Sequence, residues 1–206
     1  MLTVIVIMGI IMGIGIPAVT NLMKSGGLSS ATRQVHNALT LARQCAITQR
    51  VYARVVFAFG TPSTLNPQDM LYRTYAVMYK NAGVWQYISK WEYLPVGAVF
   101  LKTVPGGGLG ALDDNTSSLL QQGSLPFPIP GYPANVGTLA YIEFTPTGAA
   151  TPFSASVGSS TLAITEGFMP SSGTPTPTSK TTAGLLVNVA TLTVDNIVGH
   201  IKVTRP

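Results

Sequence analysis

The side chains that most often carry enzyme chemistry are scarce in this chain. It contains two histidines, His36 and His200, and one cysteine, Cys45. These three residues lie far apart in the sequence, and their spacing is not that of a zinc site. A single cysteine also excludes an intrachain disulfide. The sequence contains neither a G-x-S-x-G nucleophile elbow nor a Walker-type phosphate loop.

The acidic residues give no clear constellation either. Asp113, Asp114 and Asn115 offer oxygen ligands for calcium, but they lack the alternating spacing and the distal glutamate of a calcium loop, which favours a solvated turn. The glycine-rich stretch 106–110 precedes no Lys-Ser/Thr pair and opens no helix, so we interpret it as a flexible loop. Glu143 and Glu166 fall in predicted strands, and nothing in the sequence pairs them. We therefore predict no catalytic, cofactor-binding or metal-binding residue, and no enzyme.

One group of basic residues lies at the C-terminus. His200, Lys202 and Thr204 are predicted on one face of a terminal strand, and Arg205 follows at its end. Such an edge can contact phosphates of DNA in a salt-dependent way. The alternative, which we favour, is that lysine and arginine protect an edge strand from pairing with another chain.

The composition and length of the chain indicate its overall organisation. The chain has 206 residues and a net charge of +5, yet only 9% of its residues are charged, against about 25% in average proteins. The positive charge therefore reflects scarce acids rather than abundant bases, and it does not require a nucleic-acid partner. The length suits one membrane segment and one globular head.

The first 23 residues carry no charge, and Lys24 is the first ionisable side chain. About 20 residues at 1.5 Å rise cross a bilayer core of about 30 Å, so residues 1–23 are predicted as a transmembrane helix. Gly9 and Gly13 have the small-xxx-small spacing that lets two helices approach closely. Pro17 is predicted to kink this helix near Gly13. A cleaved signal peptide is disfavoured because no basic residue precedes the apolar run.

Residues 24–50 continue as an amphipathic helix. Apolar residues alternate at steps of three and four, which predicts one apolar stripe that packs on the rest of the chain. The stripe comprises Leu28, Ala31, Val35, Ala38, Leu39, Ala42, Cys45 and Ala46.

Residues 51–206 are predicted to form a β-rich head. Period-two patterns indicate about eight strands, at 51–59, 71–80, 84–93, 96–101, 138–145, 160–166, 184–194 and 197–204. Asn81-Ala82-Gly83 is predicted as a three-residue hairpin loop, and 105–115, 125–137 and 170–184 as long loops. The predicted fold class is α+β, with a long N-terminal helix kinked at Pro17 and an antiparallel, β-sandwich-like head.

A set of aromatic residues supports a different functional class. Tyr72, Tyr75, Trp85, Tyr87 and Trp91 lie in adjacent predicted strands. As an exposed platform they would make the chain a membrane-anchored β-sandwich binding module for carbohydrate. Core packing of alternate positions is the other interpretation, and we favour it.

The N-terminal run, with Gly9 and then Pro17 eight residues later, resembles the first segment of type IV pilins and type II secretion pseudopilins. Three further stretches resemble the GspH/FimT branch of that family. They are ALTLARQCAI at 38–47, FTPTG at 144–148 and the closing GHIKV at 199–203. Aligned on Gly9 and Pro17, the family's glutamate would stand immediately before Met1, with a basic leader and cleavage site before it. We therefore expect the true start to lie upstream of Met1, or the chain to be trimmed.

The resemblance implies a minor pilin or pseudopilin. Such a subunit waits in the bacterial inner membrane as a single-pass protein, with its head in the periplasm or outside. An assembly ATPase and a platform protein then move it into a filament with other subunits. Gly9, Gly13 and Pro17 are the expected assembly residues. In the FimT branch a basic C-terminal motif captures DNA, which would assign this role to His200, Lys202 and Arg205.

Overall fold

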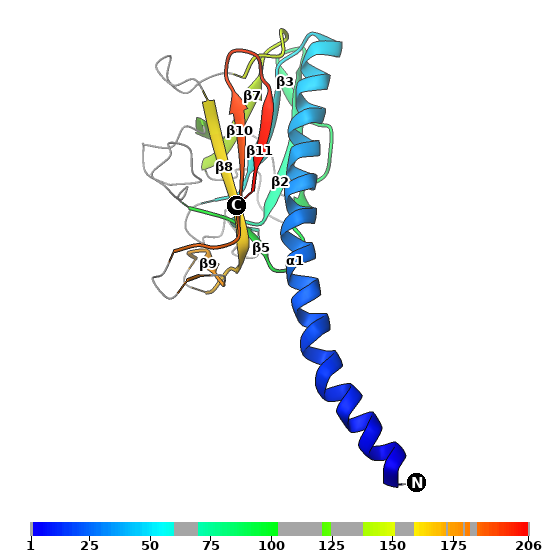
Figure 1. Cartoon of the computed structure of the whole chain (residues 1–206). Coiled ribbons are helices and arrows are strands. Elements are labelled where there is room, and N and C mark those ends of the chain that lie inside the picture. The colour runs from blue at the N-terminus through cyan, green and yellow to red at the C-terminus, as the bar shows by residue number, and fades with distance from the viewer. Residues whose placement is uncertain are drawn as a thin grey trace.

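The computed structural model of the chain describes residues 2–59, 70–102, 121–124, 138–150 and 159–205, apart from 172, 179 and 182–184. For residues 2–25, 121–124 and 138 it describes the backbone alone. One helix and eleven strands are found in these ranges. Helix α1 (Leu2–Gln49) runs along the whole head and projects beyond one end of it to the N-terminus (Figure 1).

The second half of α1 packs on the strands through the predicted stripe. Seven of its eight members are buried, from Ala31 to Ala46, and Leu28 is partly buried at its start. The helix ends because Arg50 adopts a left-handed conformation, with a φ of 54°. The amide of Val51 then donates a hydrogen bond to the carbonyl oxygen of Ala46 (3.2 Å), which closes the last turn.

The strands form two antiparallel sheets. The first sheet has the order β3-β2-β1-β7-β6, and β4 also pairs with β2. Its members are β1 (Ala53–Phe57), β2 (Thr74–Asn81), β3 (Val84–Tyr87), β4 (Glu92–Tyr93), β6 (Gln121–Ser124) and β7 (Thr138–Phe144). The second sheet has the order β11-β10-β8-β5, and β9 pairs with the end of β8. Its members are β5 (Ala98–Phe100), β8 (Ser159–Phe168), β9 (Thr176–Pro177), β10 (Val189–Asp195) and β11 (Ile201–Thr204).

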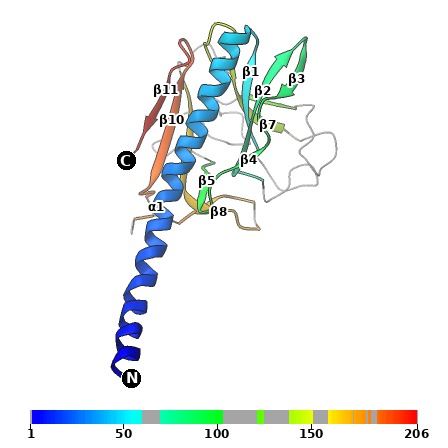
Figure 2. The same cartoon turned by 90° about the vertical axis from the view of Figure 1, so that its right-hand side faces the viewer.

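Helix α1 contacts both sheets, so the helix and the two sheets share a single hydrophobic core (Figure 2). Phe57 of the first sheet meets Phe100 of the second edge to face, with ring centroids 5.3 Å apart. A second, smaller apolar cluster lies on the other face of the first sheet. It comprises Val56, Ala58, Met70, Ala76, Met78 and Leu139.

The predicted α+β class and the two antiparallel sheets are confirmed, but several elements differ from the prediction; β10, for example, begins at Val189 rather than 184. The expected strand 84–93 is divided into β3 and β4, because the amides of Ile88 and Ser89 both donate to the carbonyl oxygen of Val77 (2.8 and 3.3 Å). Short β9 lies inside the expected loop 170–184. Strand β11 begins at Ile201 rather than 197, since 196–200 form a turn. Strand β6 was not predicted.

Several expectations lie outside the described residues. These include the loops 105–115 and 125–137 and the side chains of 1–23. Helix α1 is continuous through Pro17, and the expected kink there stays a prediction. Among the residues that the structure describes, no helix has both the length and the apolar character needed to cross a membrane.

The hairpin between β2 and β3 is confirmed, but its loop is one residue shorter than expected. Asn81 pairs with Val84, which leaves Ala82 and Gly83 as the two loop residues. Both have positive φ, 47° and 87° respectively. A loop with two positive φ values favours Asn-Gly, and alanine is strained in this conformation.

We expect Ala82→Asn to raise the free energy of unfolding by about 1 kcal/mol, because asparagine tolerates the left-handed region better than alanine. Urea denaturation of the two proteins measures this difference. Exposed Val84→Thr in the adjacent strand is the control and should change stability little. A lower stability for Ala82→Asn would contradict the described turn.

Candidate functional site

One side chain of α1 joins two distant turns of the head. Arg43 donates a hydrogen bond from Nε to the carbonyl oxygen of Gly148 (3.2 Å). Its Nη2 donates another to the carbonyl oxygen of Val198 (3.0 Å). Gly148 lies in the turn after β7, and Val198 lies in the turn between β10 and β11. Arg43 therefore ties the last turns of the helix to both sheets, and we call this arrangement the Arg43 clamp.

The two turns meet at glycines that have no room for a side chain. A Cβ on Gly199 would stand 1.9 Å from the carbonyl oxygen of Gly148, and Gly199 also has a φ of +64°. A Cβ on Gly148, whose φ is +84°, would stand 2.7 Å from Cδ1 of Ile47. Glycine is thus required at Gly199 by close approach and backbone conformation together, and it is favoured at Gly148 by its positive φ.

Asp195 fixes the turn that carries Val198. Its Oδ1 accepts hydrogen bonds from the amides of Ile197 (2.8 Å) and Val198 (3.0 Å). The amide of Gly199 donates to the carbonyl oxygen of Asp195 (2.8 Å). The amide bonds from Val198 and Ile197 hold the pKa of the Asp195 carboxyl below its usual range. The turn is therefore preorganised, and it presents Ile197 and Val198 to solvent, 79% and 55% exposed.

The three head stretches singled out in the sequence meet at this clamp. The helix stretch 38–47 supplies Arg43 and Ile47, the stretch 144–148 supplies Gly148, and the closing stretch begins at Gly199. Sequence reasoning missed the role of Arg43, because nothing in the sequence distinguishes it from the other polar residues of the helix.

The predicted basic group at the C-terminus is placed at the surface. His200 precedes β11 in the turn, Lys202 lies within the strand and Arg205 follows it, and all three are exposed. Ile201 and Val203 of the same strand pack against the core. His200 lies near enough to Asp195 to help lower its pKa. The surroundings of the other predicted site residues, Gly9, Gly13 and Pro17, lie outside the described side chains.

The predicted aromatic platform is divided between two faces of the first sheet. Tyr72 and Tyr75 are buried in the main core, 2% and 1% exposed. Burial raises the pKa of Tyr75, whose hydroxyl donates a hydrogen bond to Glu92 (2.7 Å). Trp85, Tyr87 and Trp91 pack instead against the second cluster, on the opposite face. An exposed platform of all five rings is therefore wrong.

Trp85 takes part in a stack on that opposite face. The guanidinium carbon of Arg54 lies 4.0 Å from the ring centre of Trp85 and 4.1 Å from that of Tyr141. Arg54 also forms a salt bridge with Glu143, the residue opposite it on β7. This arrangement satisfies the arginine charge within the sheet surface.

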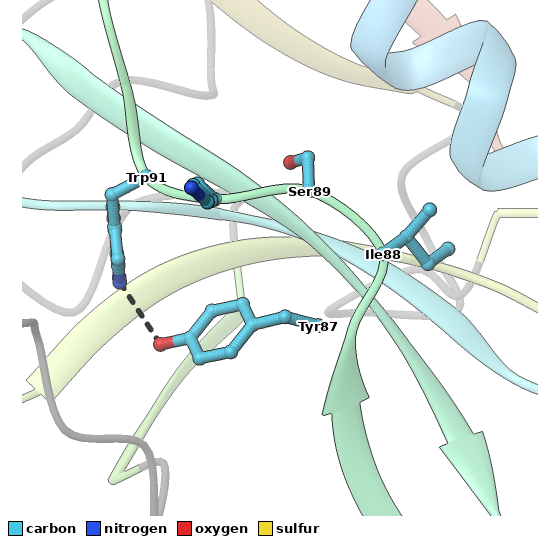
Figure 3. A pocket seen from close by; sticks show the side chains of 5 residues that line it. Tyr87, Ile88, Ser89 and Trp91 are labelled. Carbon is cyan, nitrogen blue, oxygen red and sulfur yellow. Dashed lines mark hydrogen bonds between the residues drawn. The ribbon is translucent and has the colours of Figure 1, made fainter.

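A pocket lies beside the stack, between β3 and β4. Tyr87, Ile88, Ser89, Lys90 and Trp91 line it, and its volume is about 550 Å³. Figure 3 shows Tyr87 and Trp91 joined across it, with Trp91 Nε1 donating to the Tyr87 hydroxyl (2.9 Å). Ser89 Oγ accepts the amide hydrogen of Val77 (3.1 Å). The polar atoms of these three residues thus have partners within the chain.

The described residues contain no group of three or more His, Cys, Asp or Glu side chains able to hold a metal ion. Cys45 is buried in the helix interface, and burial raises the pKa of its thiol. The arrangement with the most specific geometry is thus the Arg43 clamp, and its role is structural. It fixes one end of the head relative to the helix.

Comparison with known proteins places these features in one family. A family model described as type II transport protein GspH matches residues 31–174. This range contains the clamp residues Arg43 and Gly148, and Gly199 lies beyond it. No curated protein and no solved structure matches the chain significantly.

Removing the Arg43 clamp should weaken the head. We expect Arg43→Met to lower the free energy of unfolding by about 2–3 kcal/mol, because two carbonyl oxygens lose a charged donor while the aliphatic packing is largely kept. Urea denaturation measures the change. Arg33→Met, on the exposed face of the same helix, is the matched control and should change stability by less than about 0.5 kcal/mol. Equal effects of the two substitutions would contradict the clamp.

Close packing at Gly199 predicts an effect beyond backbone strain. We expect Gly199→Ala to lower the free energy of unfolding by about 3–4 kcal/mol, because the added Cβ collides with the Gly148 carbonyl. Gly83→Ala is the matched control: its φ is also positive, at +87°, but no atom lies within 4 Å of the added Cβ. It should cost only the left-handed strain, about 1–2 kcal/mol. Comparing the thermal unfolding of both variants separates the cost of the steric collision from the cost of the left-handed backbone.

Proposed function

Because this chain belongs to the GspH family of type II transport proteins, we propose that it is a minor pseudopilin or pilin, a structural subunit of a secretion or pilus-like filament. The observation that carries the proposal is the form of α1. Its second half is packed on the head, and its first half projects past the head (Figures 1 and 2). A helix of this form can pack with other subunits while its own head stays folded.

We further propose that residues 1–23 hold the chain in the bacterial inner membrane before assembly, as a single-pass anchor. The run has no charged residue, and its length suits a bilayer core of about 30 Å. The head would then lie in the periplasm or outside the cell. An inner-membrane platform would transfer the subunit into the filament, where neighbouring helices replace the lipid. This exchange needs no catalytic residue and no cofactor.

Gly9, Gly13 and Pro17 are the residues we propose for helix packing in the filament. Small residues at a spacing of four allow close backbone approach between helices. Pro17 removes one helical hydrogen bond and weakens the helix near Gly13, which would let it bend into the filament core.

The alternative of a binding module has less support. Burial of Tyr72 and Tyr75 removes two of the five rings of the carbohydrate platform. The exposure of His200, Lys202 and Arg205 is compatible with contact to DNA, but it is equally that of a protected edge strand. The contact with nucleic acid stays a prediction from the sequence.

Incorporation into filaments tests the proposed function. The full chain, produced in a host with its secretion machinery, is expected in the sheared filament fraction as well as in the membrane. Gly9→Leu with Gly13→Leu should lower the filament fraction about tenfold, which corresponds to a loss of about 1.4 kcal/mol in packing. Gly26→Ala is the matched control, because nothing lies within 4 Å of its added Cβ.

This experiment distinguishes a failure of the proposed helix packing from a failure of the proposed filament role. Normal incorporation of the double leucine variant would contradict the role of Gly9 and Gly13 only. Absence of the unmodified chain from filaments that otherwise assemble would contradict the filament subunit itself.

A further inference from the structure

Exposed apolar side chains gather at one end of the head. Val96 is 89% exposed, Leu185 68%, Phe168 52% and Val187 43%. They come from three segments: the turn before β5, the end of β8 and the approach to β10. We call these four residues the apolar base. Figures 1 and 2 place β5, β9 and the end of β8 at the end of the head from which α1 projects.

Hydrogen bonds between the three segments bring these side chains together. The amide of Gly167 donates to the carbonyl oxygen of Gly97 (2.8 Å), which sets Val96 beside Phe168. Both residues line one cavity of about 320 Å³, together with Arg73. Asn188, which follows Val187, accepts a hydrogen bond at its carbonyl from Thr165 Oγ1 (2.7 Å) and donates from Nδ2 to Glu166 (3.4 Å).

The backbone beside Val96 and Phe168 is closely packed, because Gly167 is enclosed by its neighbours. A Cβ there would stand 2.6 Å from the carbonyl oxygen of Thr176 and 2.8 Å from Cγ2 of Val99. The amide of Thr178 also donates to the carbonyl oxygen of Glu166 (2.9 Å). The exposure of Val96 and Phe168 is therefore set by a closely packed backbone. Large exposed apolar side chains grouped at one end of a domain are typical of a contact with another phase or molecule.

The position of α1 identifies what that contact is. The carbonyl oxygen of Val96 approaches the helix at Gly27, 3.2 Å from where a Cβ would be. The uncharged run ends at Met23, four residues earlier. At 1.5 Å per residue, Gly27 lies about 6 Å along the axis from the end of that run. If the run occupies the bilayer core, the apolar base lies at the depth of the lipid headgroups.

We propose that the apolar base lies on the bilayer surface while the chain is anchored, with Val96 and Phe168 in the interfacial region. The inference rests on the proposed membrane anchoring and deepens it. Aromatic and aliphatic side chains partition into this region when basic residues accompany them. Arg73 lines the cavity together with Glu166, and exposed Lys180 forms an isolated β-bridge with Leu186, the neighbour of Leu185. With the apolar base on the bilayer, Arg73 and Lys180 would lie near lipid phosphates, which would favour one orientation of the head.

Fluorescent labelling of the full chain in vesicles tests the orientation. Single cysteines are introduced as Val96→Cys or Leu185→Cys, and each is labelled with a polarity-sensitive fluorophore. Native Cys45 is 7% exposed and burial raises the pKa of its thiol, so labelling at neutral pH reports the new cysteine. The vesicles contain phosphatidylethanolamine and phosphatidylglycerol, with a quencher attached near the headgroup of a fraction of the lipids. We expect quenching at both positions to be several-fold stronger than at the control.

The matched control is Ile197→Cys, since Ile197 is equally apolar and 79% exposed but lies in the turn at the other end of the head. Equal, water-like fluorescence at positions 96, 185 and 197 in a chain that resists carbonate extraction would overturn the proposal and leave the anchoring intact. A chain that does not float with the vesicles would overturn both. Two labelled positions guard against a local change of fold at either one.

Discussion

The fold depends on one helix stripe that serves two sheets. Residues Ala31, Ala38, Ala42 and Ala46 dominate the stripe, and all are buried. Small side chains let the helix axis come close to the strands, so that the larger rings of Phe57 and Phe100 meet beside it. Among the described strands no β-ladder joins the two sheets, and both sheets pack on α1. Loss of this stripe would therefore expose the inner faces of both sheets as well as the helix.

The Arg43 clamp fixes the position of α1 along its axis, which the apolar contact alone does not. Hydrophobic packing is not directional, and a stripe of alanines tolerates sliding along the helix axis. Hydrogen bonds from one guanidinium to Gly148 and Val198 fix the axial position of α1 relative to both sheets. The contact is possible because Gly199 brings the two turns into van der Waals contact. With this fixed register, any displacement of the helix along its axis would move both sheets with it.

The sequence predicted what depends on periodicity and missed what depends on particular tertiary contacts. The stripe at steps of three and four, the period-two strands and the β2–β3 hairpin were all visible in it. The division of the strand at 84–93 was not, because it results from two amides that share the Val77 carbonyl. The clamp was not predicted either. Arg43 is one of several polar residues on the helix, and only the fold shows that it reaches two turns.

Gly26 and Gly27 lie where the projecting half of α1 meets the half that packs on the head. Glycine costs a helix about 1 kcal/mol relative to alanine, so two in succession weaken α1 at this point. Gly27 offsets part of that cost by admitting the Val96 carbonyl, whereas Gly26 has open space around it. A helix that remained rigid here would force the head to follow every tilt of the N-terminal half. A weak point at the base of the head would let the projecting half tilt while the apolar base keeps its position.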